Sequence, residues 1–216
     1  MTTKQYLASS ALAETSVITE IGTDEGKPYV RVGETLFHPQ GGGQKADRGT
    51  IGGASVIQVV HTDGDVNHYV DSIADLRVGM SVEMTIDPEW RQINAKSHTA
   101  GHLIAAVGDT LVSGLKAIGG HHWQGESRVE FTGALTQSPD EFLANLSKAV
   151  KQAVKDNLAV NVVGDPFASR QIQIGSFPAV PCGGTHLDSL SLLSDLELTK
   201  VKVKGDKVRV SYGFKA

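Results

Sequence analysis

The chain has 216 residues, a formal net charge of −4 and a pI near 6.0, which excludes a wholly basic nucleic-acid-binding domain. Its 40% hydrophobic content supports a sizeable core in one or two domains. No run approaches about 18 apolar residues, the start lacks signal-peptide order, and one cysteine excludes an internal disulfide. These features predict a cytoplasmic protein without membrane association.

Residues 1–86 predict a first domain of short strands separated by turn residues. Asp63 and Gly64 are typical of a two-residue hairpin turn, and several brief strands at this spacing predict a small antiparallel β-barrel. His61 and His68 flank that turn, and we expect both on the surface. The expected strands are 16–21, 29–32, 50–51, 54–61, 67–70 and 80–86.

A glycine-rich stretch, 36–49, interrupts this strand pattern. Gly41, Gly42 and Gly43 permit positive φ angles and bring backbone N–H groups close to a ligand, and Gln44 adds a side-chain amide. We therefore consider these glycines candidate substrate-binding residues. A tight turn that binds nothing is the alternative for the stretch taken by itself.

A helix is predicted from residue 87 to residue 111 and opens the second domain, 87–216. Asp87 is a suitable N-cap and Pro88 suits the first helical position. His98 and His102, one turn apart, share the face opposite the apolar stripe. Such a pair can bind one metal ion, or it can simply face solvent. The stripe consists of Ile93, Ala100, Leu103, Ile104, Val107 and Leu111.

Further elements follow in an α+β arrangement. Ser138 and Glu141 form a capping box that opens a helix to about residue 157. His121 and His122 are adjacent, so on an extended strand they point different ways and make a poor metal pair. A turn at 205–206 would place Lys204 opposite Lys207 and Lys202 opposite Arg209. Because like charges opposite each other repel, these side chains are either hydrated or bind an anion such as an RNA backbone. The expected strands are 128–131, 159–163, 170–174, 196–203 and 208–214.

The only cysteine lies in a glycine-containing loop, four residues before His186. Taken alone, Cys182 is typical of a buried small hydrophobic residue. Together with the helical pair, however, Cys182 and His186 complete a set of one thiolate and three imidazoles, which suits Zn²⁺ best. We therefore predict one zinc ion per chain, bound by His98, His102, Cys182 and His186.

The order of these motifs resembles that of the AlaX-type trans-editing proteins, which are related to the editing domain of alanyl-tRNA synthetase. The resemblance covers nearly the whole chain. The residues that carry it are Phe37 to Gly49, His98 to His102, His121 to Gln124, Arg128 to Phe131 and Cys182 to His186.

This resemblance implies a small N-terminal antiparallel β-barrel followed by an α/β two-layer editing domain. It also implies zinc-dependent hydrolysis of tRNA(Ala) mischarged with serine or glycine, with the acceptor end of the tRNA as the partner. By position, Gln44 corresponds to the residue near the site and Gln124 to the polar residue beside the ester. Thr99 corresponds to a hydroxyl contact with the substrate, and Arg128 to a substrate-binding residue.

Four protein ligands ordinarily make a closed, structural zinc site. Either one ligand leaves the metal, which then activates water, or the metal orients the substrate amine. We favour the second mechanism. The sequence contains neither a P-loop nor a dinucleotide-binding fingerprint, so no ATP requirement is expected. A peptidase is disfavoured because the histidine motif lacks the glutamate of H-E-x-x-H.

Two alternatives remain at this stage. A cysteine nucleophile paired with histidine is possible, although it would leave His98 and His102 unused. A non-catalytic zinc-containing module that binds aminoacyl-tRNA ends or amino acids is the second. The sequence leaves the oligomeric state open.

Overall fold

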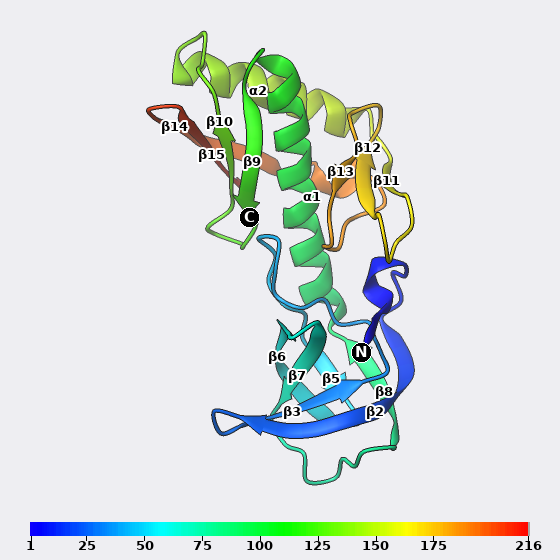
Figure 1. Cartoon of the computed structure of the whole chain (residues 1–216). Coiled ribbons are helices and arrows are strands. Elements are labelled where there is room, and N and C mark those ends of the chain that lie inside the picture. Colours follow the sequence, from blue (N-terminus) through cyan, green and yellow to red (C-terminus); the bar gives the residue numbers. More distant parts are fainter. Residues whose placement is uncertain (216) are drawn as a thin grey trace. The chain divides into compact units, whose positions relative to one another are not determined.

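The computed structural model describes residues 1–215, which combine two α-helices with a majority of β-strands (Figure 1). This confirms the predicted mixture of helices and strands. Contacts divide the chain into two compact units. Unit 1 contains residues 1–41 and 45–92, and unit 2 contains residues 42–44 and the described chain from Ile93 onward. The division falls within the first helix, and a three-residue piece of the glycine-rich stretch belongs to unit 2.

Unit 1 is a closed ring of six antiparallel strands. Its order is β2-β3-β7-β6-β5-β8, and β8 pairs back onto β2. The strands are β2 (Ala13–Asp24), β3 (Lys27–Val32), β5 (Gly49–Ile51), β6 (Ala54–Thr62), β7 (Asp65–Val70) and β8 (Ser81–Ile86). The six strands expected from the sequence are therefore confirmed. Two short parallel strands, β1 (Thr3–Lys4) and β4 (Glu34–Thr35), and the 3₁₀ turn η1 (Gln5–Leu7) were not predicted.

Alternation along β8 shows why the ring closes around a core. Val82, Met84 and Ile86 are buried, whereas the residues between them are exposed, because successive side chains of a strand point to opposite faces. The turn between β6 and β7 has φ angles of 49° at Asp63 and 82° at Gly64. Positive φ at both central residues matches the twist of a two-residue hairpin, and confirms that prediction.

His68 is fully buried in this ring, so the prediction that it lies on the surface is wrong. Its Nε2 lies 2.7 Å from the Thr35 hydroxyl and its Nδ1 lies 3.1 Å from the Val30 carbonyl oxygen. Burial lowers the pKa of His68 to about 4. A position beside the hairpin turn did not mean exposure here, because every residue of β7 after Asp65 is buried. His61, on the paired strand, is exposed as expected.

The first helix, α1 (Pro88–Leu111), begins where the sequence predicts. The Asp87 carboxylate accepts a hydrogen bond of 3.0 Å from the Trp90 N–H, as an N-cap does. Most of the apolar stripe is buried, but Leu111 is 38% exposed at the last helical position. None of the helices in residues 1–215 has the length and apolar character needed to cross a membrane.

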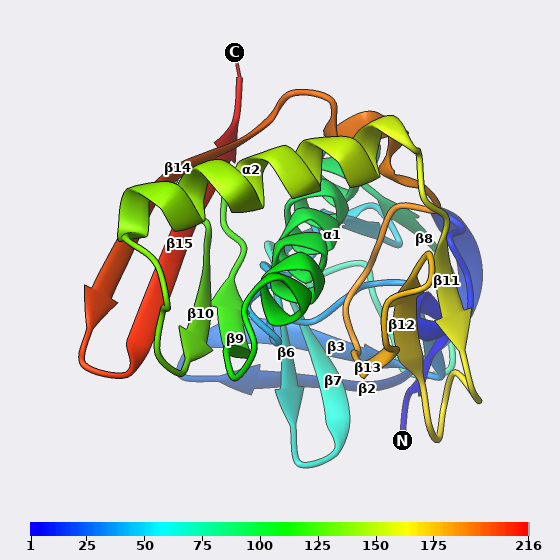
Figure 2. The ribbon, with the colours of Figure 1, turned by 90° about the horizontal axis from the view of Figure 1, so that it is seen from above.

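Unit 2 packs both helices and two sheets around one core. Helix α2 (Pro139–Lys155) starts with the predicted capping box of Ser138 and Glu141, and lies along a four-stranded sheet (Figure 2). That sheet has the order β14-β15-β10-β9 and a second has the order β11-β12-β13. Their strands are β9 (Lys116–His121), β10 (Arg128–Thr132), β11 (Val160–Val163), β12 (Gln171–Ile174), β13 (Val180–Pro181), β14 (Leu196–Lys204) and β15 (Lys207–Phe214). Strands β9 and β13 were not predicted.

Candidate metal centre

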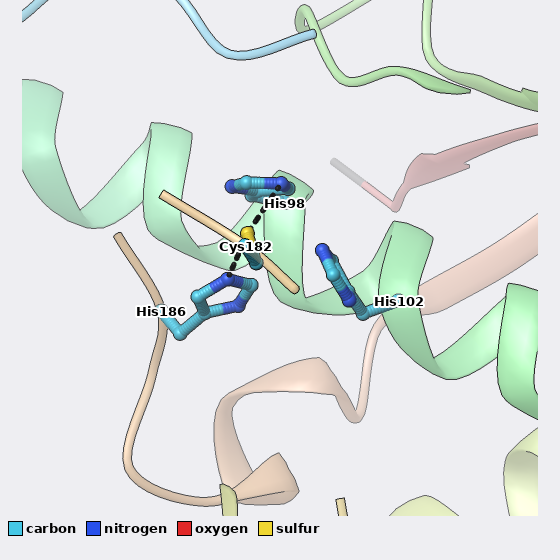
Figure 3. A group of neighbouring side chains, drawn as sticks. All are labelled: His98, His102, Cys182 and His186. Carbon is cyan, nitrogen blue, oxygen red and sulfur yellow. Dashed lines mark hydrogen bonds between the residues drawn. The ribbon is translucent and has the colours of Figure 1, made fainter. Parts of the chain in front are cut away.

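Four side chains that are distant in sequence converge in unit 2 (Figure 3). His98 and His102 project from α1, and Cys182 and His186 project from the loop that follows β13. One potential ligand atom from each residue lies within 4.8 Å of the other three. The Cys182 Sγ atom is 3.7 Å from His98 Nε2 and 3.2 Å from His186 Nε2.

These separations fit a metal ion. Bonds of about 2.0–2.3 Å in a tetrahedron place ligand atoms roughly 3.3–3.7 Å apart. Because the donors are one sulfur and three imidazole nitrogens, the group combines the ligands typical of zinc proteins. The residues present can therefore hold a metal ion with small adjustments of the side chains.

Helix geometry positions two of the four ligands. Residues four apart lie one turn above each other on the same face, so the rings of His98 and His102 have centroids 4.9 Å apart. The His186 ring completes the group, at 4.5 Å from the His98 centroid and 4.7 Å from the His102 centroid. Convergence of the loop on the helix, rather than either segment alone, builds the site.

Gln44 determines which nitrogen of His98 is free to bind a metal. Its Oε1 atom lies 2.7 Å from His98 Nδ1 and accepts the hydrogen of that nitrogen, which leaves Nε2 for a metal. The same oxygen accepts the Thr185 N–H at 3.0 Å, and the Gln44 amide donates to the Thr185 hydroxyl at 2.8 Å. Since Gln44 is only 1% exposed, this amide is a rigid support within unit 2.

Thr99 supports His186 in a comparable way. Its Oγ1 atom lies 3.3 Å from His186 Nδ1 and accepts the Leu187 N–H at 3.0 Å. The His186 Nε2 atom is then the nitrogen that faces Cys182. Thr99 is fully buried, and the described contacts of its hydroxyl are with the ligand loop. The structure thus connects Thr99 to a metal ligand, while its predicted contact with a serine hydroxyl stays a prediction.

The Cys182 loop approaches α1 so closely that one position must be glycine. A Cβ atom on Gly184 would lie 2.1 Å from His98 Cε1 and 2.8 Å from Gln44 Oε1. Gly183 next to it has open space around a Cβ atom. The Gly184 N–H also points at Cys182 Sγ over 3.4 Å, which favours a thiolate.

The protonation states of the site suit metal binding. Burial and the charge of Arg170 lower the pKa of His102 to about 4, so its imidazole is neutral near pH 7. Burial raises the pKa of the Cys182 thiol, against the effects of the Gly184 N–H and Arg170. A divalent cation would reverse that balance, because a coordinated thiol is deprotonated. Arg170 also donates to the Cys182 carbonyl oxygen, a role for which the sequence offered no indication.

His122 contributes a wall of the site that the sequence analysis left out. Its ring stacks on His98 with centroids 4.9 Å apart, and its Nδ1 lies 2.7 Å from the Tyr212 hydroxyl. That hydroxyl donates to the Ser97 carbonyl at 2.8 Å. The adjacent His121 instead contacts Trp123, so the two histidines diverge as expected. The small Gly101 makes room for this stacking, since its Cβ would lie 2.2 Å from His122 Cε1.

The glycine-rich stretch contributes backbone to the same region. Gly43 has φ of 78°, and a Cβ atom there would lie 2.4 Å from the Gly120 carbonyl oxygen. The Gly43 carbonyl accepts the His122 N–H at 2.9 Å. Gly41 and Gly42 are exposed.

Gln124 and Arg128, the other predicted substrate residues, are not among the four clustered side chains. Gln124 is exposed in the turn 124–126. Arg128, on β10, lies 3.5 Å from Glu130 and contacts the Glu126 carbonyl. The roles of Gln124 and Arg128 toward the substrate, and those of Gly41 to Gly43, stay predictions.

Several curated proteins are similar to the chain. It is 31% identical to alanyl-tRNA editing protein Aarsd1 of Danio rerio over 204 residues, which cover 86% of this chain and 48% of the relative. It is 29% identical to alanyl-tRNA editing protein AlaX-M of Pyrococcus horikoshii over 178 residues, which cover 77% of both chains. It therefore spans about half the length of the Aarsd1 relative and most of the shorter AlaX-M.

A longer protein, of which the chain covers about a quarter, also matches. The chain is 28% identical to an alanine–tRNA ligase of Lactococcus lactis subsp. cremoris over 243 aligned positions. The alignment covers 95% of this chain and 27% of the ligase. No protein-family model matches the chain. These similarities relate the chain to alanyl-tRNA editing proteins, the AlaX type among them.

Proposed function

We propose that this protein hydrolyses the ester bond of tRNA(Ala) that carries serine or glycine, and so removes the wrong amino acid. The supporting observation is the cluster of His98, His102, Cys182 and His186 with its buried Gln44 support. The names of the relatives, which describe alanyl-tRNA editing, support the choice of substrate. Because charged tRNA is the substrate, we place the activity in the cytoplasm, with the tRNA acceptor end as partner.

We further propose that the bound metal is one Zn²⁺ ion. The donor set and the 3.2 and 3.7 Å separations from Cys182 Sγ suit zinc, and a neutral His102 is ready to coordinate. When bound, zinc would supply a positive charge that holds the substrate amine or polarises water.

The chain's own residues would position the ester. Gln44 and Thr99 hold His98 and His186, and so fix the ligand face that the substrate meets. The backbone N–H groups of the glycine-rich stretch and the amide of Gln124 are our candidates for contacts with the ester oxygens. In this proposal, residues 1–86 form a small β-barrel domain that carries the glycine-rich motif, and residues 87–216 form a two-layer editing domain.

Substitution of a ligand tests the proposal directly. Cys182→Ala should abolish stoichiometric zinc and the release of serine from Ser-tRNA(Ala), whereas Ser113→Ala, outside the ligand cluster, should preserve both. Metal analysis and a deacylation assay measure the two effects. A Cys182→Ala protein that retains zinc and the wild-type rate would disprove the proposed metal site.

Alkylation separates a metal ligand from a nucleophile. Cys182 bound to zinc should react slowly with iodoacetamide until a chelator is added, because the metal occupies the thiolate lone pair. Rapid alkylation of the zinc-loaded protein would instead support the cysteine nucleophile.

A non-catalytic module is the second candidate, because a set of four protein ligands is typical of structural zinc. The deacylation assay distinguishes the two. Serine release at the buffer rate, together with measurable binding of aminoacyl-tRNA, would favour the module over the hydrolase.

A further inference from the structure

A cavity of about 260 Å³ lies in unit 2 and has the ligand His102 in its wall. Its other walls come from α1, β9, β12, β13 and the segment that joins β12 to β13. Among the lining residues are Ala105, Ala106, Ile172, Phe177 and Val180, which make it largely apolar. Asp109 and Lys116 place charged groups in the same wall. An apolar hollow with a few polar groups is the usual form of a small-molecule site.

The cavity is too large for the amino acid that the proposed reaction removes. A serine side chain adds only one carbon and one oxygen to the ester, and glycine adds neither. From His102 to Asp109 the wall extends along α1 by seven residues, or about 10 Å at 1.5 Å per residue. This length suits a ribose and a base laid along the helix from the metal ligands.

We propose that this cavity holds the terminal adenosine of the tRNA, with the ester directed toward His102. This inference rests on the proposed function, because a tRNA that carries an amino acid ends in that nucleoside. Phe177 supplies an aromatic face in the wall, and bases stack on aromatic side chains whatever their sequence. Ala105 and Ala106 leave space on the helix side for the flat base.

Asp109 supplies a preference for adenine. Its Oδ1 accepts the Ala117 N–H at 2.6 Å, and among residues 1–215 its Oδ2 has the exposed Lys116 ammonium, at 3.8 Å, as its one ionic partner. A carboxylate oxygen can accept a hydrogen bond from the exocyclic amino group of adenine. It repels the carbonyl oxygen that guanine carries at the corresponding position.

Adenosine monophosphate is the probe, with binding followed by calorimetry or by NMR. Wild-type protein should bind AMP more tightly than GMP. Phe177→Ala should weaken AMP binding by about 5- to 100-fold, and Phe177→Tyr should restore it. Phe167→Ala is the matched control, because Phe167 is an aromatic residue that is 56% exposed outside the cavity wall.

Asp109→Asn tests the base preference. Its side-chain oxygen can still accept the Ala117 N–H, while its amide hydrogens suit the guanine oxygen, so the preference for AMP over GMP should shrink or reverse. In kinetics, Phe177→Ala should raise KM for Ser-tRNA(Ala), and its loss on serine methyl ester should be smaller because that ester has no nucleoside.

The outcomes separate the two proposals. Wild-type protein that does not bind AMP, or Phe177→Ala that binds it as wild type does, overturns the adenosine site. Equal losses on the tRNA and on the methyl ester also overturn it. Wild-type protein that binds AMP but releases no serine from Ser-tRNA(Ala) overturns the proposed hydrolysis and leaves the adenosine site standing.

Discussion

Gln44 is only 1% exposed, and its amide oxygen accepts from His98 while its amide nitrogen donates to Thr185. Removal of such a support from a metal ligand typically costs 10- to 100-fold in metal affinity. We therefore expect Gln44→Ala to bind zinc about 10- to 100-fold more weakly, measured by competition with a chromophoric chelator. Gln44→Glu keeps an oxygen that can accept the His98 hydrogen, so it should retain most of the affinity. Equal affinity of Gln44→Ala and wild type would contradict this role.

Two neighbouring glycines offer a matched comparison. Gly184→Ala would place a methyl group 2.1 Å from the His98 ring, whereas Gly183→Ala meets open space. Overpacking of this kind costs about 1–3 kcal/mol, so Gly184→Ala should lower the free energy of unfolding and displace His98 from the metal. Urea unfolding and zinc titration of both variants measure these effects. Indistinguishable behaviour of the two alanine variants would show that the loop has more room than the structure indicates.

The sequence could indicate the four candidate ligands by residue type, but not the residues that contact them. Cysteine and histidine are uncommon and chemically distinctive, so His98, His102, Cys182 and His186 are conspicuous even when they are dispersed. Arg170 and His122 reach the site through a loop and through the end of a strand. Their approach depends on tertiary packing, which no local spacing encodes.

Elements with strong local preferences were predicted best. The capping residues of α1 and α2, and the turns at 63–64 and 205–206, lie where the sequence indicates. Strand β9 was not predicted because Gly119 and Gly120 interrupt the alternation of apolar and polar side chains along it. Strand β13 was not predicted because it is only two residues long. Both strands owe their existence to pairing with neighbours.

Strand β7 shows the consequence of burying an ionisable group inside the ring. The folded protein holds His68 neutral, with a pKa of about 4 against 6.5 for an ordinary histidine. Between these values the unfolded chain binds more protons, so stability is complete above 6.5 and declines as the pH falls toward 4. We expect His68 to account for a loss of about 2 kcal/mol between about pH 7 and pH 5.

Urea unfolding of His68→Gln and wild type at both pH values tests this expectation. The variant should lose less stability on acidification than wild type does. His61→Gln is the matched control, because His61 is exposed on the paired strand, and it should keep most of the wild-type dependence. If His68→Gln and wild type lose equal stability, the buried imidazole is not the source.

The distribution of charge over the whole molecule is uneven. The hairpin of β14 and β15 contains five basic and two acidic residues, a formal charge of +3, whereas the chain carries −4. Its register places Lys202 opposite Arg209 and Lys204 opposite Lys207, as predicted from the sequence. Arg209 is paired with Glu130 at 2.8 Å, whereas all four lysines of the hairpin, Lys200 included, are exposed.

We expect the exposed lysines of this hairpin to bind RNA phosphates. Lys202→Glu combined with Lys204→Glu should weaken tRNA binding and reduce the slope of log K against log salt by about 0.7–0.9 for each phosphate that the variant no longer neutralises. Filter binding over a range of salt concentrations measures the slope. Lys148→Glu combined with Lys151→Glu makes the same charge change on α2, and should leave the slope as in wild type. Equal slopes for wild type and the hairpin variant would show that the lysines of the hairpin do not bind RNA phosphates.

The three-residue piece that contains Gln44 has a consequence for the evolution of unit 2. It lies before the first helix in the gene, yet its contacts belong with the residues that follow that helix. A recombination event that moved only the continuous segment from Ile93 onward would carry all four candidate metal ligands but leave behind Gln44, which binds His98. A gene segment that encodes all of unit 2 must therefore begin at or before residue 42, although most of unit 2 begins at Ile93.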